Sequence, residues 1–267
     1  MIKKNILFEK YYLFLVLFLF NLLCATSVLA GSPFLTDDPE TVEYKHHEVY
    51  LFSAVDKTND SNIVQGPALE YNYGVVPNLQ LHVIAPFEYF GPLQDDFSQY
   101  GFGDMELGAK YRFLTETNSH PQIGIYPAVE LSTGETDRGL GNGRTWYKLP
   151  MWLQKSWGTW TVDGGGGYAL NSSPGMRNYG FGGLLLQREF GEHFSLGGEI
   201  FAQQSSAVDQ RGFTLFNLGG SYNFTSNFSL LFSFGHTFTG QRNAVAYLGL
   251  YWTWGPGKAQ SANSSVN

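Results

Sequence analysis

The chain has one cysteine and little charge. Cys24 is the only cysteine among 267 residues, so no internal disulfide and no cysteine-based zinc site can form. Charged residues make up 15% of the chain, against about 25% in an average protein. The net charge of -7 argues against a nucleic-acid partner, because such a partner requires a basic face. Aromatic residues make up 16%, which excludes a largely disordered chain.

Long apolar runs are missing after the first thirty residues. In residues 1–30, three lysines precede the apolar run 13–25, and Ala30 lies at the end of a small-residue cleavage pattern. This order predicts a cleaved secretory signal peptide. A transmembrane anchor is the alternative, but the run is shorter than the roughly 20 residues that a spanning helix needs. If the remaining chain is in a membrane, it does not cross it as helices.

Alternation of apolar and polar residues with period two recurs from residue 44 to residue 254. In 227–238, for example, large apolar side chains alternate with serine, glycine and threonine. Period two predicts β-strands rather than helices. We expect twelve strands, at 44–55, 64–74, 79–89, 103–114, 121–133, 145–156, 159–169, 178–190, 193–203, 212–224, 227–238 and 243–254.

The expected connections alternate between short and long. Tight turns are expected at 75–78, 158, 191–192 and 225–226, an intermediate connection at 115–120, and longer polar stretches near 56–63, 90–102, 134–144, 170–177 and 204–211. Outer-membrane barrels have short periplasmic turns and longer external loops. A soluble β-sandwich with an aromatic core is the alternative, but so high a strand content is unusual for a globular domain. Aromatic residues near the tight turns also fit an interfacial girdle. We therefore predict an all-β fold, an antiparallel transmembrane β-barrel of about twelve strands over residues 44–254.

The alternation also separates the charges from the large apolar side chains. If the apolar face meets lipid, the charged face lines the lumen. The candidate lumen-lining residues are Glu48, Glu70, His82, Glu88, Asp104, Glu106, Lys110, Arg112, Glu130, Lys148, Asp163 and Glu199. Eight acids against three fixed bases predict a negative lumen that concentrates cations. Alternatively, these charges pair across strands and only fill the barrel, and Lys110 and Arg112 are expected to pair with acids on neighbouring strands.

Several local strings carry a resemblance to a known family. They are residues Pro33–Pro39, Gly101–Asp104, Gly108–Phe113, Leu149–Lys155 and Asp163–Tyr168. The chain resembles the bacterial outer-membrane transporter-like proteins grouped as the "putative MetA-pathway of phenol degradation" family. This resemblance implies a barrel channel for hydrophobic or aromatic compounds and carries over no catalytic residue. One feature differs: outer-membrane barrels usually end on an aromatic residue, whereas here Trp254 is followed by the polar tail 255–267.

Passive passage of small molecules is the predicted function. Twelve strands lie between the filled interior of eight-stranded barrels and the open channel of sixteen-stranded ones, so we expect a narrow lumen. The expected location is the outer membrane of a Gram-negative bacterium. The expected partners are its lipid bilayer, a small-molecule solute and the barrel-assembly machinery, with no cofactor, metal or nucleic acid. The segment 31–43 is either a periplasmic extension or a plug-like gate inside the lumen.

Two other functions stay open on the sequence alone. An outer-membrane barrel enzyme acting on lipids would need a serine and a histidine within hydrogen-bond reach. The nearest case is His236, but Ser233 and Thr237 lie at odd offsets from it and should face the other side. No Gly-x-Ser-x-Gly motif occurs either, so we expect no enzyme. A structural or adhesive surface barrel would act through its loops.

Overall fold

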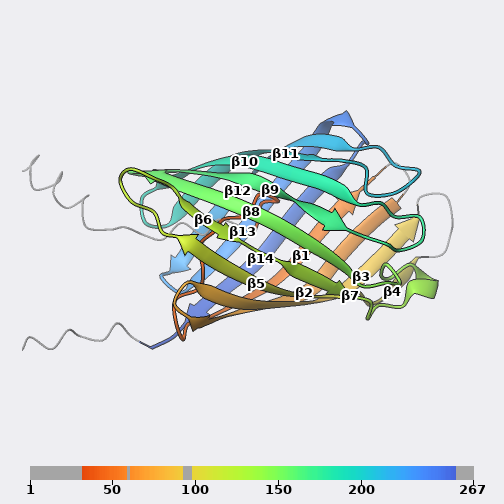
Figure 1. Cartoon of the computed structure of the whole chain (residues 1–267), viewed down its shortest axis with the longest axis horizontal. Coiled ribbons are helices and arrows are strands. Elements are labelled where there is room, and N and C mark those ends of the chain that lie inside the picture. Colours follow the sequence, from red (N-terminus) through yellow and green to blue (C-terminus); the bar gives the residue numbers. More distant parts are fainter. Residues whose placement is uncertain (1–31, 59–60, 93–97, 257–267) are drawn as a thin grey trace, which may run out of the picture.

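The structure, a computed structural model, describes residues 32–58, 61–92 and 98–256. The predicted signal peptide, residues 1–30, and most of the polar tail lie outside the described residues. Within the described part of the chain, no helix is long and apolar enough to cross a membrane. Most of this part forms one antiparallel sheet (Figure 1).

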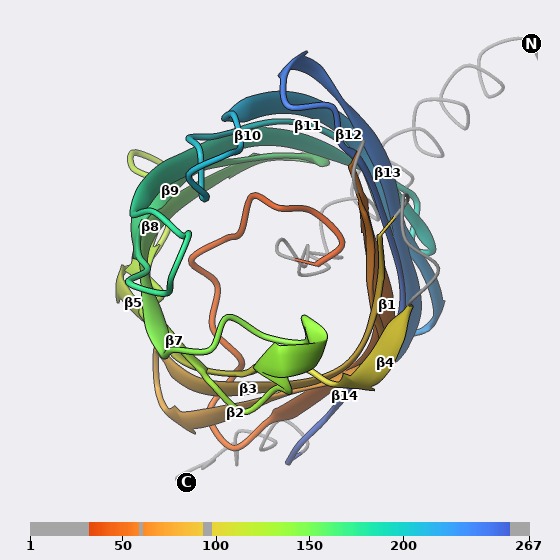
Figure 2. The same cartoon turned by 90° about the vertical axis from the view of Figure 1, so that its right-hand side faces the viewer.

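The sheet closes on itself. Neighbours in the sheet are mostly neighbours in the chain, and β14 pairs with β1 along the full length of both strands, so the strands form a barrel (Figures 1 and 2). The elements are β1 (His47–Lys57), β2 (Ser61–Val76), β3 (Leu79–Pro92), β4 (Gln99–Phe102), β5 (Met105–Leu114), β6 (Gln122–Ile125), β7 (Ala128–Leu131), the 3₁₀ helix η1 (Thr136–Arg138), β8 (Trp146–Trp157), β9 (Trp160–Leu170), β10 (Tyr179–Phe190), β11 (Phe194–Gln203), β12 (Phe213–Thr225), β13 (Phe228–Gly240) and β14 (Ala244–Trp254).

Two of the barrel strands are interrupted, so fourteen segments form twelve strands. β4 and β5 pair with successive parts of β3, and β6 and β7 both lie between β5 and β8. The second interruption falls at Tyr126 and Pro127, because proline has no backbone N–H to give to the ladder. The ladder still continues across it: Tyr126 donates to the carbonyl of Pro150 at 3.2 Å, and Ala109 donates to that of Pro127 at 3.0 Å. The predicted closed antiparallel barrel of twelve strands is confirmed.

Two expected loops are largely strand. The stretch 56–63 was expected to be a long connection, but β1 extends to Lys57 and β2 begins at Ser61. Most of 90–102 also belongs to β3 and β4. The expectation was wrong because it equated polar composition with a loop, whereas polar residues continue a strand as long as the ladder hydrogen bonds continue. The long connections are 132–145, 171–178 and 204–212, all at the same end of the barrel.

The wall of the barrel has an apolar outside and a polar inside. On β13, Phe234 is 65% exposed on the outer face, while its neighbours Ser233 and Gly235 are buried. Large apolar side chains exposed on the strands include Leu51, Leu69, Leu81, Leu107, Met151, Leu184, Ile200, Leu218, Phe234 and Leu248. The buried residues on the strands include many polar and charged ones, among them Gln80, Gln154, Asp163, Gln187, Glu199 and Asn217, beside glycines and a smaller set of apolar residues. A globular protein has the opposite arrangement, and this one suits an outer surface covered by lipid.

Aromatic rings form a continuous band where the first and last strands meet, near the short turns. The His47 ring stacks on Trp254 at 5.2 Å between ring centroids and on Tyr73 at 4.7 Å. On the neighbouring strand, Phe228 stacks on Trp252 at 4.3 Å. Trp254, the last residue of β14, therefore packs against the start of β1 and closes the seam. Such a band is typical of barrels at a membrane interface.

Replacing Leu248 with arginine tests the outer face. Leu248 is 57% exposed near the middle of β14, and we expect Leu248→Arg to cost about 2–4 kcal/mol of folding free energy in a bilayer. The measurement is urea unfolding of the refolded barrel in lipid vesicles, followed by the heat-modifiable shift on an SDS gel. Leu248→Met is the matched control and should unfold like the parent. Equal stability of the arginine variant would contradict the assignment of this face to lipid.

Candidate functional site

The segment before the first strand lies inside the barrel. We call residues 32–43 the luminal segment; Figure 2 shows it, in orange-red, within the ring of strands. Its contacts come from several strands around the ring. Ser233 of β13 donates a hydrogen bond to the carbonyl of Pro33 at 2.6 Å, and the amide of Val42 donates to Gln80 of β3 at 3.0 Å. Both partners, Ser233 and Gln80, are buried residues of the barrel wall.

One carboxylate of the wall binds the middle of the segment, and two glycines of the wall leave space for it. The Glu199 side chain of β11 accepts hydrogen bonds from the backbone amides of Leu35, at 3.2 Å, and Thr36. A Cβ atom on Gly183 would lie 2.0 Å from the Thr36 hydroxyl, and one on Gly197 would lie 2.9 Å from the Phe34 ring. The segment can therefore approach the wall this closely only where the wall has no side chains.

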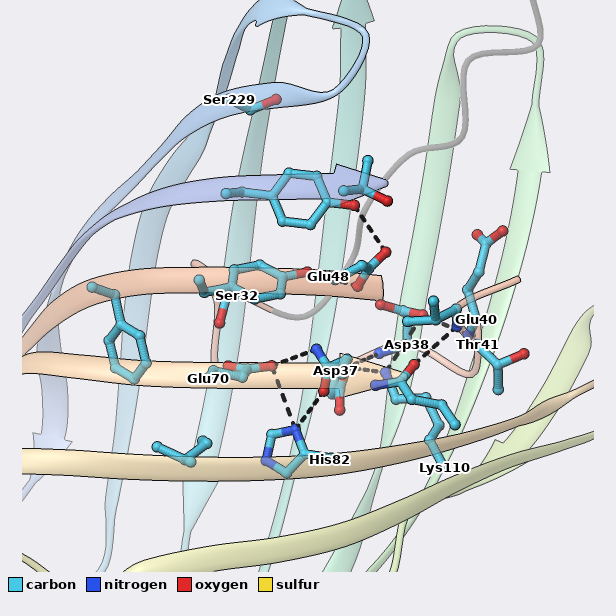
Figure 3. A pocket seen from close by; sticks show the side chains of 18 of the residues that line it. Ser32, Asp37, Asp38, Glu40, Thr41, Glu48, Glu70, His82, Lys110 and Ser229 are labelled. Atoms are coloured by element: carbon cyan, nitrogen blue, oxygen red, sulfur yellow. Dashed lines mark hydrogen bonds and ion pairs between the residues drawn. The ribbon is translucent and has the colours of Figure 1, made fainter. Parts of the chain in front are cut away.

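Lys110 binds the luminal segment rather than the barrel wall. Its ammonium lies 2.9 Å from Asp37 and 3.8 Å from Asp38, as Figure 3 shows. Lys110 and Asp38 are both buried. We expected Lys110 to pair with acids on neighbouring strands, and this expectation was wrong. Its partners come from a segment 73 residues earlier in the chain, which supplies acids closer to the ammonium than any across the strands.

A cavity of about 1060 Å³ remains inside the barrel beside the segment. Ten of the residues that line it are acidic and two are lysines, Lys110 and Lys148. The lining continues to the short-turn end, where Glu192, Thr225 and Ser226 take part. Eight of the twelve candidate lumen residues border this cavity: Glu48, Glu70, His82, Asp104, Glu106, Lys110, Glu130 and Lys148.

Five of these eight residues contact one another in a chain along the inner wall, in which acids alternate with His82 and Lys148. His82 of β3 lies 3.5 Å from Glu70 and 3.3 Å from Glu106, and its Nδ1 is also 2.8 Å from the amide oxygen of Asn72. Lys148 of β8 pairs with Glu106 and, at 3.6 Å, with Glu130. The pairing register explains the contacts, because Glu106 lies opposite Glu130 and next to the strand that carries His82. Glu70 and His82 face the same space in Figure 3.

Arg112 and Asp163 are connected through amides. Arg112 donates to Asn78 at 2.9 Å and to Gln122 at 3.0 Å. Gln122 donates in turn to Gln154, which donates to Asp163 at 2.7 Å. Arg112 was expected to pair with an acid on a neighbouring strand, and this was wrong. Two amide side chains, that of Asn78 in the turn before β3 and that of Gln122 at the start of β6, satisfy the guanidinium as neutral acceptors.

Asp104 fixes the long loop at the other end of the barrel. Its carboxylate accepts hydrogen bonds from the amides of Gly134, at 2.9 Å, and Asn142, at 2.6 Å. The loop 132–145, with η1 and the fully buried Leu140, thereby turns inward over the opening of the barrel (Figure 2). Glu88, the remaining candidate on this side, accepts a hydrogen bond from Gln65 at 3.0 Å.

Glu48 lies against an aromatic part of the wall. Its two oxygens accept hydrogen bonds from the hydroxyls of Tyr251, at 2.8 Å, and Tyr50, at 3.3 Å. The rings of Tyr50 and Tyr251 are 4.8 Å apart, and those of Phe52 and Tyr247 are 5.2 Å apart and stacked. All four rings line the cavity. The alternation that selected Glu48 also places Tyr50 and Phe52 on the inner face, but aromatic residues were not selected as site residues.

Among the described residues, neither a metal-binding group nor the serine–histidine pair considered from the sequence is brought together. No three His, Cys, Asp or Glu side chains among residues 32–58, 61–92 and 98–256 are arranged to hold a metal ion. His236 is exposed on the outer face, whereas Ser233 is buried inside and donates to the luminal segment. The two side chains therefore do not face each other.

Comparison with known proteins agrees with this geometry. The structure is a closed membrane-type barrel with a polar interior, the architecture also seen in solved outer membrane channels and porins. Residues 47–254 match the family described as "Putative MetA-pathway of phenol degradation", and the chain belongs to this family. The luminal segment precedes the matched residues. A search of curated proteins gave no match.

Three solved structures illustrate the likeness. An outer membrane channel from Pseudomonas putida F1 has a TM-score of 0.68 at 18% identity, covering 81% of this chain and 98% of that one. The KdgM porin in complex with disordered oligogalacturonate has a TM-score of 0.52 at 10% identity, covering 77% and 99%. The β domain of the Bordetella autotransporter BrkA has a TM-score of 0.52 at 11% identity, covering 78% and 99%. At these identities the likeness shows a shared fold.

Removing the ammonium of Lys110 should loosen the luminal segment. We expect Lys110→Met to leave Asp37 and Asp38 without their cation. A reporter cysteine in place of the fully buried Thr36 should then react with a maleimide at least about tenfold faster than the same cysteine in a barrel that keeps Lys110. The only native cysteine, Cys24, lies in the predicted signal peptide. Lys155→Met removes an ion pair of similar length, 2.7 Å to Glu116, and should leave the rate unchanged. An unchanged rate in Lys110→Met would show that the lysine does not hold the segment.

Proposed function

We propose that this protein is an outer-membrane channel for the passive passage of small molecules in a Gram-negative bacterium. In this proposal, residues 1–30 are a signal peptide that is cleaved on export, the barrel-assembly machinery inserts residues 44–254, and residues 255–267 are a polar C-terminal tail. The twelve candidate lumen residues line or shape the path. The compounds carried are small molecules that include hydrophobic or aromatic ones, which fits the description of the family and the aromatic rings in the cavity.

One observation carries the proposal: a polar cavity lies inside a closed barrel whose outer face is apolar. The outer face seals against lipid without further protein, because every described strand except the short segment β4 is paired on both sides. A cavity of about 1060 Å³ inside such a wall is larger than a packed interior leaves. The architecture therefore offers a water-accessible path in place of a filled core.

Two elements restrict that path. The luminal segment crosses the interior, and the loop 132–145 covers part of the far opening. Passage then depends on displacement of the segment from its contacts with Glu199 and Lys110. The surplus of acids in the cavity favours cations in the remaining space.

Single-channel recording across a planar bilayer tests the channel and its charge together. With a salt gradient across the membrane, we expect discrete steps whose reversal potential shows a preference for cations, because ten acids and two lysines line the cavity. Anion-selective steps would keep the channel and reject the acidic lumen. Absence of steps, with insertion verified by protease protection, would reject the channel.

Deleting residues 32–43 tests the role of the luminal segment. We expect larger conductance steps than in the parent, since the deletion removes the chain that crosses the lumen and leaves β1 intact. Gly183→Val is a second route to the same result, because a side chain there would overlap Thr36. Gly198→Ala is the control, because its added Cβ would make only ordinary van der Waals contacts, at 3.5 Å from Leu218 and 3.7 Å from Phe216. Equal conductance in deletion and parent would mean that solutes pass by another route.

A further inference from the structure

We propose that the part of the wall formed by Glu48, Tyr50, Phe52, Tyr247 and Tyr251 is a binding site for organic amines, molecules that join a positive charge to an apolar body. The inference rests on the proposed function, since the site lies in the cavity along the proposed path, and it names a class of solute. Three properties of the described residues support it: an acid without a cation, a set of aromatic rings, and the absence of a free lysine ammonium in the cavity lining.

Glu48 is a carboxylate whose partners are neutral. Its hydrogen bonds come from the hydroxyls of Tyr50 and Tyr251, and among the described residues it takes part in no ion pair. Glu70 lies on the neighbouring strand, opposite Tyr50 in the pairing register. One of its oxygens accepts a hydrogen bond from Asn72 and also lies 3.5 Å from the ring of His82, so among the described residues its other oxygen is left for a further partner. Figure 3 shows Glu48 and Glu70 on neighbouring strands beside the same space. A cation entering this space gains attraction without having to displace a bound side chain.

The cavity has no free ammonium to compete for these acids. Lys110 is bound to Asp37 and Asp38, and Lys148 is bound to Glu106 and Glu130. The positive charges of the cavity are thus committed to other acids. An incoming anion meets surplus negative charge, whereas an incoming cation meets Glu48, which takes part in no ion pair among the described residues.

The aromatic rings select the apolar body and also favour the charge. Tyr50, Phe52, Tyr247 and Tyr251 come from the adjacent strands β1 and β14 and border the cavity. Aromatic faces attract cations within about 6 Å of the ring centre, and quaternary and alkyl ammonium groups are recognised in this way. An inorganic cation would gain the attraction to the carboxylate but not the apolar contact with the rings. A neutral phenyl compound would gain the apolar contact but not the attraction. An amine with an aromatic or aliphatic body gains both.

The test is calorimetric titration of the refolded full barrel in detergent with three ligands of similar size. They are phenethylamine, phenethyl alcohol and phenylpropionate. We expect the amine to bind at least about tenfold more tightly than the alcohol, a difference of about 1.4 kcal/mol, and the carboxylate to bind most weakly. Equal affinity for amine and alcohol would overturn the proposal, and tightest binding of the carboxylate would show that the lysines govern the cavity.

Variants locate the site. Glu48→Gln keeps the shape of the side chain and an oxygen for the tyrosine hydroxyls, and it should bring the amine to within about threefold of the alcohol. Tyr247→Leu removes one ring and should weaken amine and alcohol together. Asp209→Asn makes the same change of charge in an exposed loop and should leave the ratio unchanged. If Glu48→Gln retained the full preference for the amine, the proposed site would be wrong; if it failed to refold, the three-ligand comparison in the parent would still decide the ligand class.

Binding to the solubilised barrel does not require passage, so the two proposals can fail separately. A preference for the amine without conductance would reject the channel and keep the site. Conductance without that preference would do the opposite.

Discussion

The closed ladder of backbone hydrogen bonds is the constraint on which the rest of the structure depends. An apolar solvent offers no partner for an open sheet edge, so β14 must return to β1, and it does so along eleven residue pairs. Closure fixes which face of each strand points inward. Because side chains alternate, the outward face becomes apolar and the inward face becomes the place for everything polar. Even the break at Pro127 is bridged by neighbouring hydrogen bonds.

An interior built from polar side chains has to be satisfied from within. Charged side chains inside the barrel find partners of three kinds. Basic side chains, His82 and Lys148, contact acids; amide side chains bond Arg112 and Asp163; and backbone amides of the luminal segment bond Glu199. Glycines on the inner face, such as Gly183, leave the space that the luminal segment uses. The volume not used in these contacts is the cavity.

The sequence predicts this fold well because alternation is a local property of the chain. Parity alone places Glu106 and His82 on one face and Leu107 on the other, and the structure has them so. Parity does not say which inward side chains meet, since that depends on register and on segments without periodicity. Lys110 was therefore assigned partners across the strands, while its actual partners Asp37 and Asp38 lie in a segment with no strand pattern. Parity also places the aromatic rings around Glu48 on the inner face, but it does not show that they gather beside one carboxylate, since that too depends on register.

The luminal segment can be regarded as a ligand that the barrel carries on its own chain. Three residues, 44–46, separate it from β1, so it is present at its binding surface at an effective concentration in the millimolar range or above. Any solute that uses the same surface competes with this tethered occupant, and its apparent affinity is lower than its intrinsic affinity by the fraction of time that the surface is vacant. Sequence changes within twelve residues could thus retune access for all solutes while the wall of the barrel stays the same.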